Sequence, residues 1–317
     1  MNLVGVDIGG TKIAAGLVGG KGDLMCQTRL PTLSRSGFKK SLAQIRTAIE
    51  EILKRAKSDS LSVGGIGICT AGPIDYDRGV VVNPPNLKGW KEVPLARIIG
   101  EKFGLEARLE NDANAAALAE MRWGAARGYN NIFFVSIGTG IGTAIILNGR
   151  LYRGRRGMAG EGGHMVVNFD ADGAGCGCGN TGCIESIASG PAAARRAGEI
   201  MRERPTLLND LCGGNKEELT MVMIGRAAED SDAVALEVIG EMGWHLGIWL
   251  GSIINLLDPE IIVVGGGVSM VGEPLFESIR GSALKHTINP YANEIPIVPA
   301  SLGEDAGIYG GAALFLT

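Results

Sequence analysis

A pattern of strand, glycine turn and strand occurs twice in this chain, and it constrains the fold more than any other feature. Residues 4–20 read VGVDIGGTKIAAGLVGG, and residues 134–150 read FVSIGTGIGTAIILNGR. With the second copy shifted by one residue, so that matched positions differ by 129, Val6 pairs with Val135, Ile8 with Ile137, and Gly9 with Gly138. A chance likeness is one interpretation, because glycine-turned hairpins resemble one another. The sharper interpretation is a duplicated domain in which each half offers a glycine turn to one shared ligand.

Strands alternate with helices in both halves of the chain, which is typical of an α/β protein. Apolar runs predict strands at 2–8, 13–19, 24–30, 63–69, 79–82, 107–110, 260–264 and 295–299. Helical patterns are predicted at 36–57, 94–103, 113–126, 191–203, 216–229, 232–257, 273–285 and 305–315. We therefore expect mixed sheets covered by helices. A length of 317 residues indicates about two domains, which should meet at a cleft where ligands bind.

Composition excludes several classes of protein. A net charge of −4 provides no basic field, so nucleic acid is not an expected partner. The first residues lack the basic region and apolar stretch of a signal peptide. No run of roughly 18 apolar residues is present, so we expect no membrane segment. A cytoplasmic, reducing environment is therefore predicted, in which closely spaced cysteines favour a metal over a disulfide.

The glycine turns are candidate phosphate sites, because successive backbone N–H groups in a tight turn form an anion-binding concavity. The first turn adds a carboxylate, a hydroxyl and an ammonium to its glycines (Asp7, Gly9, Gly10, Thr11 and Lys12). This set suits a nucleotide phosphate with Mg²⁺, with Asp7 on the hydrated metal. The second turn, Gly138–Thr139–Gly140, repeats the donors without the carboxylate. Each turn taken alone is more typical of a plain hairpin, and two turns in register across a duplication are a much more specific signal.

Two further features follow predicted strands. Asn111 and Asp112 come directly after the strand at 107–110, where an Asp commonly caps a helix. Alternatively, a carboxylate at that strand end could accept a proton from a substrate hydroxyl. Three glycines, 265–267, follow the strand at 260–264. They form either a plain turn or a surface on which an adenine lies close to the backbone.

The segment 161–185 gathers half of the cysteines of the chain. His164, Cys176, Cys178 and Cys183 supply one imidazole and three thiols, between the carboxylates Glu161 and Glu185. This donor set suits tetrahedral Zn²⁺, and four protein ligands leave no open position, so the ion should be structural. Buried free thiols or a disulfide are the alternative. We interpret the two glutamates as functional side chains that the metal site holds in place.

These residues together resemble the ROK (repressor, open reading frame, kinase) family of sugar kinases. The resemblance covers essentially the whole chain. It depends on DIGGTK (7–12), END (110–112), GTGIG (138–142), AGEGGH (159–164), CGCGNTGCIE (176–185) and VVGGG (263–267). The resemblance implies an actin-like, hexokinase-type duplicated fold. It implies a small α/β domain of residues 1–111 plus 303–317, and a large α/β domain of 112–302 with a zinc-binding segment at 164–183.

The resemblance also implies a role for each motif. Asp112 would be the general base that acts on a sugar 6-hydroxyl. Sugar hydroxyls would be contacted by Asn86, Asn111, Asp112, Glu161, His164 and Glu185. Mg·ATP phosphates would be held by Asp7, Gly9, Gly10, Thr11, Lys12, Gly138, Thr139 and Gly140, with Gly266 and Gly267 near adenosine. Zinc would be bound by His164, Cys176, Cys178 and Cys183. A polyol is well recognised by such carboxylates, each of which accepts hydrogen bonds from neighbouring hydroxyls.

The activity expected from this resemblance is ATP-dependent 6-phosphorylation of glucose. Alternatives are kinases of N-acetylglucosamine, N-acetylmannosamine or other hexoses, and polyphosphate remains open as the phosphoryl donor. A sugar-responsive repressor is the alternative outside enzymes. It is disfavoured because Asp7 lies too near the first residue for a preceding DNA-binding domain. The resemblance further implies a homodimer or homotetramer.

Overall fold

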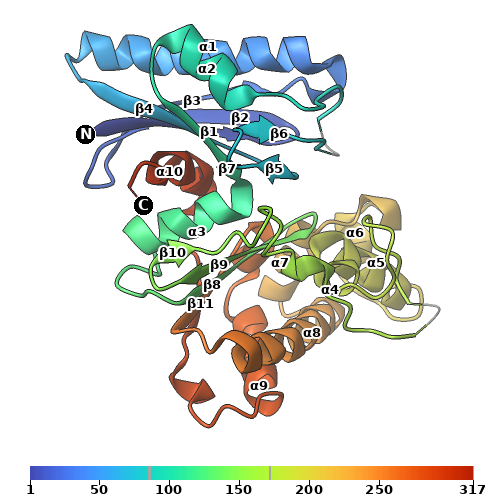
Figure 1. Ribbon diagram of the computed structural model, residues 1–317. Coiled ribbons are helices and arrows are strands. Elements are labelled where there is room, and N and C mark those ends of the chain that lie inside the picture. Colours follow the sequence, from blue (N-terminus) through green and yellow to red (C-terminus); the bar gives the residue numbers. More distant parts are fainter. Residues whose placement is uncertain (85–86, 171–172, 317) are drawn as a thin grey trace. The chain divides into compact units, whose positions relative to one another are not determined.

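The structure is a computed structural model that describes residues 1–84, 87–170 and 173–316 (Figure 1). The chain divides into two compact units. Unit 1 comprises Met1–Asn130, Ala144–Ala159 and Ser301–Thr317, and unit 2 comprises Asn131–Thr143 and Gly160–Ala300. These units are groups of residues that pack together. The division into domains at residues 111 and 303 stays a prediction.

Unit 1 is built on a five-stranded sheet with the order β3-β2-β1-β4-β7. Its strands are β1 (Asn2–Ile8), β2 (Lys12–Val18), β3 (Leu24–Pro31), β4 (Val63–Thr70) and β7 (Ala107–Asn111). The hairpin neighbours β1–β2 and β2–β3 are antiparallel, and β1–β4 and β4–β7 are parallel. The central strands are almost wholly buried because helices cover both faces, so they read as continuous apolar runs.

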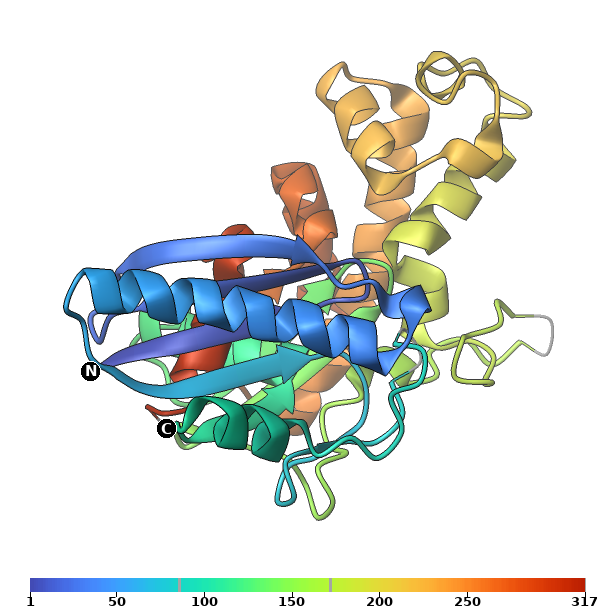
Figure 2. The same ribbon diagram turned by 90° about the horizontal axis from the view of Figure 1, so that it is seen from above.

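Helices lie on both faces of this sheet (Figure 1). On one face, α1 (Phe38–Ser58) runs along the strands and α2 (Leu95–Phe103) lies beside it, as Figure 2 shows from above. The apolar stripe of α1 is buried at Leu42, Ile45, Ile49 and Ile52. The other face carries α3 (Asp112–Trp123) and α10 (Ala306–Ala313). A short hairpin of β5 (Ile74–Asp75) and β6 (Val80–Val81) completes the unit.

Backbone packs directly on backbone where α10 meets β1 and β4. A Cβ atom on Gly5 would lie 1.7 Å from the carbonyl oxygen of Ile308. A Cβ atom on Gly67 would lie equally close, at 1.7 Å, to the carbonyl oxygen of Gly311. Only glycine fits at these strand positions, which explains some of the 50 glycines of the chain. The contact sets α10 at a fixed distance from the strand ends that carry Asp7.

The second sheet repeats the plan of the first. Its order is β10-β9-β8-β11-β12. The strands are β8 (Ile132–Ile137), β9 (Ile141–Leu147), β10 (Arg150–Leu151), β11 (Ile261–Gly265) and β12 (Ile297–Pro299). In each sheet, three strands that are consecutive in sequence lie side by side. Two later strands are then added in parallel next to the first of these three. This common order supports the interpretation of the repeat as a duplication.

The helices of unit 2 are α4 (Ile184–Ala188), α5 (Gly190–Ile200), α6 (Leu208–Leu211), α7 (Met221–Glu229), α8 (Ala233–Leu257) and α9 (Glu273–Lys285). The long helix α8 is capped by Asp232, whose side chain accepts the N–H of Ala235. Glycines four residues apart, at 243, 247 and 251, let α9 approach α8 closely. None of the helices in the described part of the chain combines the length and apolarity that a bilayer crossing requires.

Several predicted helices were too long, including those at 191–203 and 305–315, which end at Ile200 and Ala313. The helix expected at 216–229 is a short 3-10 turn, Lys216–Glu218, followed by α7 from Met221. Leu219 and Thr220 are extended between them, because the Thr220 hydroxyl accepts the N–H of Met223 and so caps a new helix. The helix expected at 113–126 ends at Trp123, where Gly124 has a non-helical backbone.

The contact between α10 and β4 predicts opposite outcomes for two glycine-to-alanine substitutions. We expect Gly67→Ala to lower the free energy of unfolding by about 3 kcal/mol or more, because the new Cβ overpacks the Gly311 carbonyl. Gly281→Ala is the matched control, since it lies inside α9 with open space around it. It should stabilise the protein by up to about 1 kcal/mol. Urea denaturation of both variants measures the difference, and equal effects would contradict the packing described.

Candidate active site

The carboxyl ends of three parallel strands place the predicted catalytic residues at one edge of the first sheet. The strand register aligns Asp7, Cys69 and Glu110 in one row. The next row contains Ile8, Thr70 and Asn111, and Asp112 follows. Polar side chains at such an edge are characteristic of ligand sites in α/β proteins. The predicted turn 9–12 and the pair Asn111–Asp112 thus emerge at the same edge.

Asn111 caps helix α3. Its side-chain oxygen accepts the backbone N–H of Ala113 at 2.9 Å and that of Asn114 at 3.4 Å. Asp112 is the first residue of the helix, and its Oδ1 also accepts the N–H of Ala113 at 2.9 Å. The predicted capping role therefore falls mainly to Asn111. Asp112 is an exposed residue, yet protein atoms crowd its carboxyl group, and this partial loss of bulk water raises its pKa.

Glu110 is a buried member of this edge for which the sequence suggested no role. Its Oε1 accepts the N–H of Asn111 and the side-chain amide of Asn114, each at 3.0 Å. Its Oε2 accepts Nε–H of Arg153 at 2.7 Å, and the guanidinium stacks 3.8 Å from the ring centroid of Tyr76. The ion pair holds the chain in place immediately before Asp112. Its only signal in the sequence was the acid at the start of the END motif.

Asp7 lies beside Asp112, and their charges repel. Burial, and to a lesser extent the negative charge of Asp112, raise the pKa of Asp7 to about 6. A weak hydrogen bond from Cys69 and the charge of Lys12 act in the opposite direction. A carboxylate held under these conditions favours a cation nearby, because a cation offsets both desolvation and repulsion.

In the turn after β1, one part of the backbone is hydrogen-bonded within the protein and the other part is exposed to solvent. The N–H of Gly9 donates to the carbonyl of Lys12 at 3.0 Å, and the Thr32 hydroxyl donates to the carbonyl of Gly9 at 2.7 Å. Gly10, Thr11 and Lys12 are exposed. The ammonium of Lys12 has a long surface ion pair, 3.5 Å, with Glu304. The open side therefore presents a hydroxyl and an ammonium to an incoming anion.

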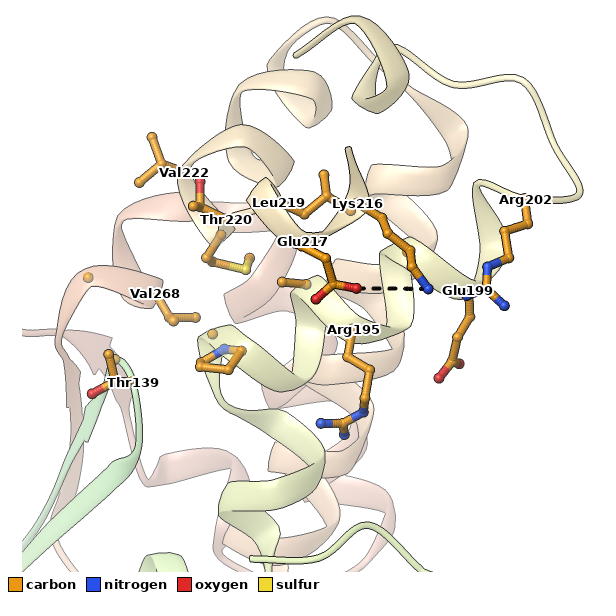
Figure 3. A pocket seen from close by; sticks show the side chains of 17 residues that line it. Thr139, Arg195, Glu199, Arg202, Lys216, Glu217, Leu219, Thr220, Val222 and Val268 are labelled. Atoms are coloured by element: carbon orange, nitrogen blue, oxygen red, sulfur yellow. Dashed lines mark ion pairs between the residues drawn. The ribbon is translucent and has the colours of Figure 1, made fainter. Parts of the chain in front are cut away.

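Unit 2 contains a cavity of about 670 Å³ beside the second glycine turn. This volume lies within the range of about 300–1,000 Å³ that is common for small-molecule sites. Figure 3 shows the surrounding side chains, which come from α5, the 3-10 turn at 216–218, α7 and the glycine turn after β11. Gly138, Thr139 and Gly267 line the cavity, which brings two separately predicted glycine turns together.

Charged side chains of this cavity were missed by the sequence analysis. Arg195, Lys216 and Glu217 surround it, with Lys216 and Glu217 paired at 4.0 Å (Figure 3). The guanidinium of Arg195 also donates to the carbonyl of Ser186 at 2.7 Å. These residues come from two separate elements, α5 and the turn at 216–218, and belong to no recognisable motif. Only the packing of α5 against the following turn and α7 brings them together.

Two of the predicted glycines do not line the cavity. A Cβ atom on Gly140 would lie 2.4 Å from Oε2 of Glu185, so this glycine leaves room for that carboxylate. Gly266 has a positive φ of 83°, and a Cβ atom there would lie 2.3 Å from the carbonyl oxygen of Ile137. Both glycines are therefore required by their immediate protein neighbours.

The four predicted metal ligands come together in unit 2. The donor atoms of His164, Cys176, Cys178 and Cys183 all lie within 4.8 Å of one another. The sulfurs of Cys178 and Cys183 are 3.8 Å apart, too far for a disulfide, and the cysteines are free. Two sulfurs bound tetrahedrally at about 2.3 Å to one zinc ion would be separated by about 3.8 Å. The spacing of this cluster therefore fits a small tetrahedral ion.

The flanking carboxylates have different surroundings. Glu161 is exposed and precedes the turn Gly162–His164, which Thr143 fixes by donating to the carbonyl of Gly160 and accepting the N–H of Gly162. Glu185 is largely buried, and its Oε2 accepts the N–H of Ile141 at 2.9 Å. Asn86, the remaining predicted sugar contact, lies outside the described residues.

Comparison with known proteins identifies the family. The ROK family profile matches residues 3–317. The chain belongs to the ROK family. A glucokinase of Halalkalibacterium halodurans is 36% identical over 314 residues, which cover 98% of this chain and 94% of that protein. The predicted family resemblance is confirmed.

Solved ROK structures confirm the predicted actin-like, hexokinase-type fold. A ROK family glucokinase from Streptomyces griseus, in complex with glucose and AMPPNP, has a TM-score of 0.85 and 36% identity, with 99% of both chains covered. A ROK family transcriptional regulator, a homolog of the E. coli MLC protein, has a TM-score of 0.87 and 29% identity, with 99% of this chain and 77% of that chain covered. The ROK fold thus occurs in enzymes and in regulators.

Asp7 provides a prediction about stability and pH. Its pKa is raised from 3.8 to about 6 in the folded protein, so ionised Asp7 destabilises the fold above pH 6. This penalty disappears as the pH falls below the unfolded pKa. We expect Asp7→Asn to raise the free energy of unfolding by on the order of 1–3 kcal/mol at about pH 7.5, with little gain near pH 4. Urea denaturation without Mg²⁺ measures both values.

The control for this experiment is Asp77→Asn, which changes an exposed carboxylate in the turn after β5. It should leave the unfolding free energy nearly constant at both pH values. A gain for Asp7→Asn that is the same at both pH values would show that ionisation of Asp7 is not its source.

Proposed function

We propose that this ROK protein is an ATP-dependent sugar kinase that phosphorylates the 6-hydroxyl of glucose. The observation that carries the proposal is Asp112, at a strand end and beside Asp7, with a raised pKa. A general base works best when its pKa is nearer the operating pH. Asp112 would accept the proton of the sugar hydroxyl as that oxygen attacks the terminal phosphoryl group of the nucleotide.

The nucleotide would be shared between two glycine turns. Asp7 would hold the water shell of Mg²⁺, and Thr11 and Lys12 would contact phosphate oxygens, with Gly9 and Gly10 allowing a close approach of the backbone. Gly138, Thr139 and Gly140 would contribute the second turn. The cavity of unit 2 would hold adenosine near Gly266 and Gly267, and its volume and mixed lining support this use. Mg²⁺ supplies charge neutralisation for the phosphates when it is bound.

The sugar would be recognised by side chains that accept hydrogen bonds from its hydroxyls. We propose Asn111, Glu161, His164 and Glu185 for this role, with Asn86 as a further contact. His164 and the three cysteines would bind a structural zinc ion, because three thiols and one imidazole at this spacing fit that ion. The metal-bound cluster would hold Glu161 and Glu185 in position, because the side chains of a polar binding site need rigid neighbouring residues.

A kinase of N-acetylglucosamine, N-acetylmannosamine or another hexose is the alternative with the same chemistry. The residues described do not select between a hydroxyl and an acetamido group at C2 of the sugar. Polyphosphate could also replace ATP as the donor. A sugar-responsive regulator is the alternative without catalysis, and it would have no need of the paired carboxylates Asp7 and Asp112. Assembly as a homodimer or homotetramer and a cytoplasmic location stay predictions.

A coupled assay over a sugar panel, with ATP and polyphosphate as donors, tests the proposal. We expect glucose with ATP to give the highest kcat/KM. Asp112→Asn should keep the fold, since Asn111 still caps α3, and should lose at least about 100-fold in kcat. Asp77→Asn is the control and should retain wild-type activity. Near-normal turnover of Asp112→Asn would exclude this residue as the base, and no turnover of any sugar would favour a regulator.

The metal proposal is tested by the zinc content of freshly reduced protein. We expect about one zinc ion per chain, bound by four ligands. Cys178→Ser should lose most of this zinc and lower the thermal stability of the protein. Cys26→Ala, outside the cluster, should keep the full zinc content. A clear absence of metal from reduced wild-type protein would refute the zinc site.

A further inference from the structure

We infer that Glu185 is a positioning residue for the glycine turn Gly138–Gly140, and that the His164–cysteine cluster supports nucleotide binding through it. The inference rests on the proposed function, because it concerns the nucleotide side of the same site. It adds a second role for Glu185 beyond contact with a sugar. Every residue in the argument belongs to unit 2.

The carboxylate of Glu185 fills the space on one side of the turn. Its Oε2 accepts the N–H of Ile141, the residue directly after the turn, at 2.9 Å. A Cβ atom on Gly140 would lie 2.4 Å from the same oxygen. Glu185 can therefore accept this N–H only because position 140 has no side chain. Loss of the carboxylate would leave the Ile141 N–H without this acceptor and an open space beside the turn.

The other side of Glu185 faces the cluster. Its Oε1 lies 3.4 Å from Sγ of Cys176 and 4.0 Å from Nδ1 of His164. Glu185 also belongs to the first turn of α4, whose N-cap residue is the buried Cys183. Because Cys183 is a cluster member, its position in the cluster determines where α4 begins. The start of α4 in turn determines the position of the Glu185 carboxylate.

Two backbone contacts join the same segment to the turn. A Cβ atom on Gly163, beside His164, would lie 2.0 Å from the carbonyl oxygen of Ile141. The N–H of Gly190, at the start of α5, donates to the carbonyl of Gly138 at 2.9 Å. Gly138 and Gly190 both line the cavity. The turn is thus held by chain segments on both sides of the cluster, and Glu185 is the side chain between them.

Nucleotide binding in the absence of sugar separates this role from sugar recognition. The probe is AMPPNP with Mg²⁺, measured by isothermal titration calorimetry on zinc-loaded protein. We expect Glu185→Ala to weaken binding by about tenfold while its zinc content stays at the wild-type value. Glu185→Gln should stay within about threefold of wild type, because the amide oxygen still accepts the Ile141 N–H. Glu229→Ala, an exposed glutamate at the end of α7, is the matched control.

A double-mutant cycle with Gly140→Ala tests the contact itself. In wild-type protein the new Cβ should displace Glu185 and weaken AMPPNP binding by about tenfold. In the Glu185→Ala background the same substitution should cost little, because the Cβ enters the vacated space. Equal losses in both backgrounds would mean that Gly140 serves the nucleotide directly, which would overturn the inference.

The remaining outcomes separate this inference from the proposed function. Wild-type affinity for AMPPNP in Glu185→Ala, together with weaker sugar binding, would assign Glu185 to the sugar alone and overturn the inference. Removal of zinc by a chelator should weaken AMPPNP binding, and reloading should restore it. If the wild-type protein binds no AMPPNP at all, the kinase proposal fails. If Glu185→Ala does not fold, Gly140→Ala alone still tests the inference, because wild-type affinity for AMPPNP in that variant would overturn it.

Discussion

The close packing of α10 on β1 and β4 is the constraint on which the carboxylate edge of unit 1 depends, because it holds Asp7 in place despite its repulsion by Asp112. Two carboxylates at one sheet edge, partly withdrawn from water, are unfavourable in the folded protein. Their placement persists because the surrounding backbone is fixed independently of them. Helix α10 rests on β1 and β4 through glycines that admit no side chain, and Asn111 caps α3. The free energy gained from this packing offsets the cost of keeping the two carboxylates close together. The resulting arrangement is suited to a cation and a phosphate.

Glu110 and Glu120 differ from Asp7 and Asp112 in the number of their hydrogen-bond partners. Both glutamates are almost inaccessible to solvent. Glu110 has a cation, Arg153, and two further hydrogen-bond donors. The carboxylate of Glu120 accepts backbone N–H groups of Ala125, Ser301 and Leu302. These carboxylates are satisfied by the protein and serve structure. Asp7 and Asp112 have fewer partners of this kind, which is the expected difference between a structural and a reactive carboxylate.

In unit 2, the glycine turn after β8 is held by the segment that carries the cysteine and histidine cluster. The four cluster residues, Glu185 and the start of α5 follow one another within 27 residues, from His164 to Gly190. The structural ion proposed above would hold together a short segment that makes many contacts. Among its described residues the segment has little regular secondary structure before α4, so the cluster would replace the support that a helix or strand provides.

The sequence by itself determined the α/β class, most strand positions, the duplication and the four residues of the cluster. Apolar runs and glycine turns are local signals, and metal ligands are recognisable by residue type and spacing. Tertiary structure alone decided the partners of these residues. Arg153 meets Glu110, Arg195 reaches the cavity, and Gly140 makes room for Glu185 only because distant segments pack together. Such pairings depend on long-range geometry, for which a single sequence contains no periodic or spacing signal.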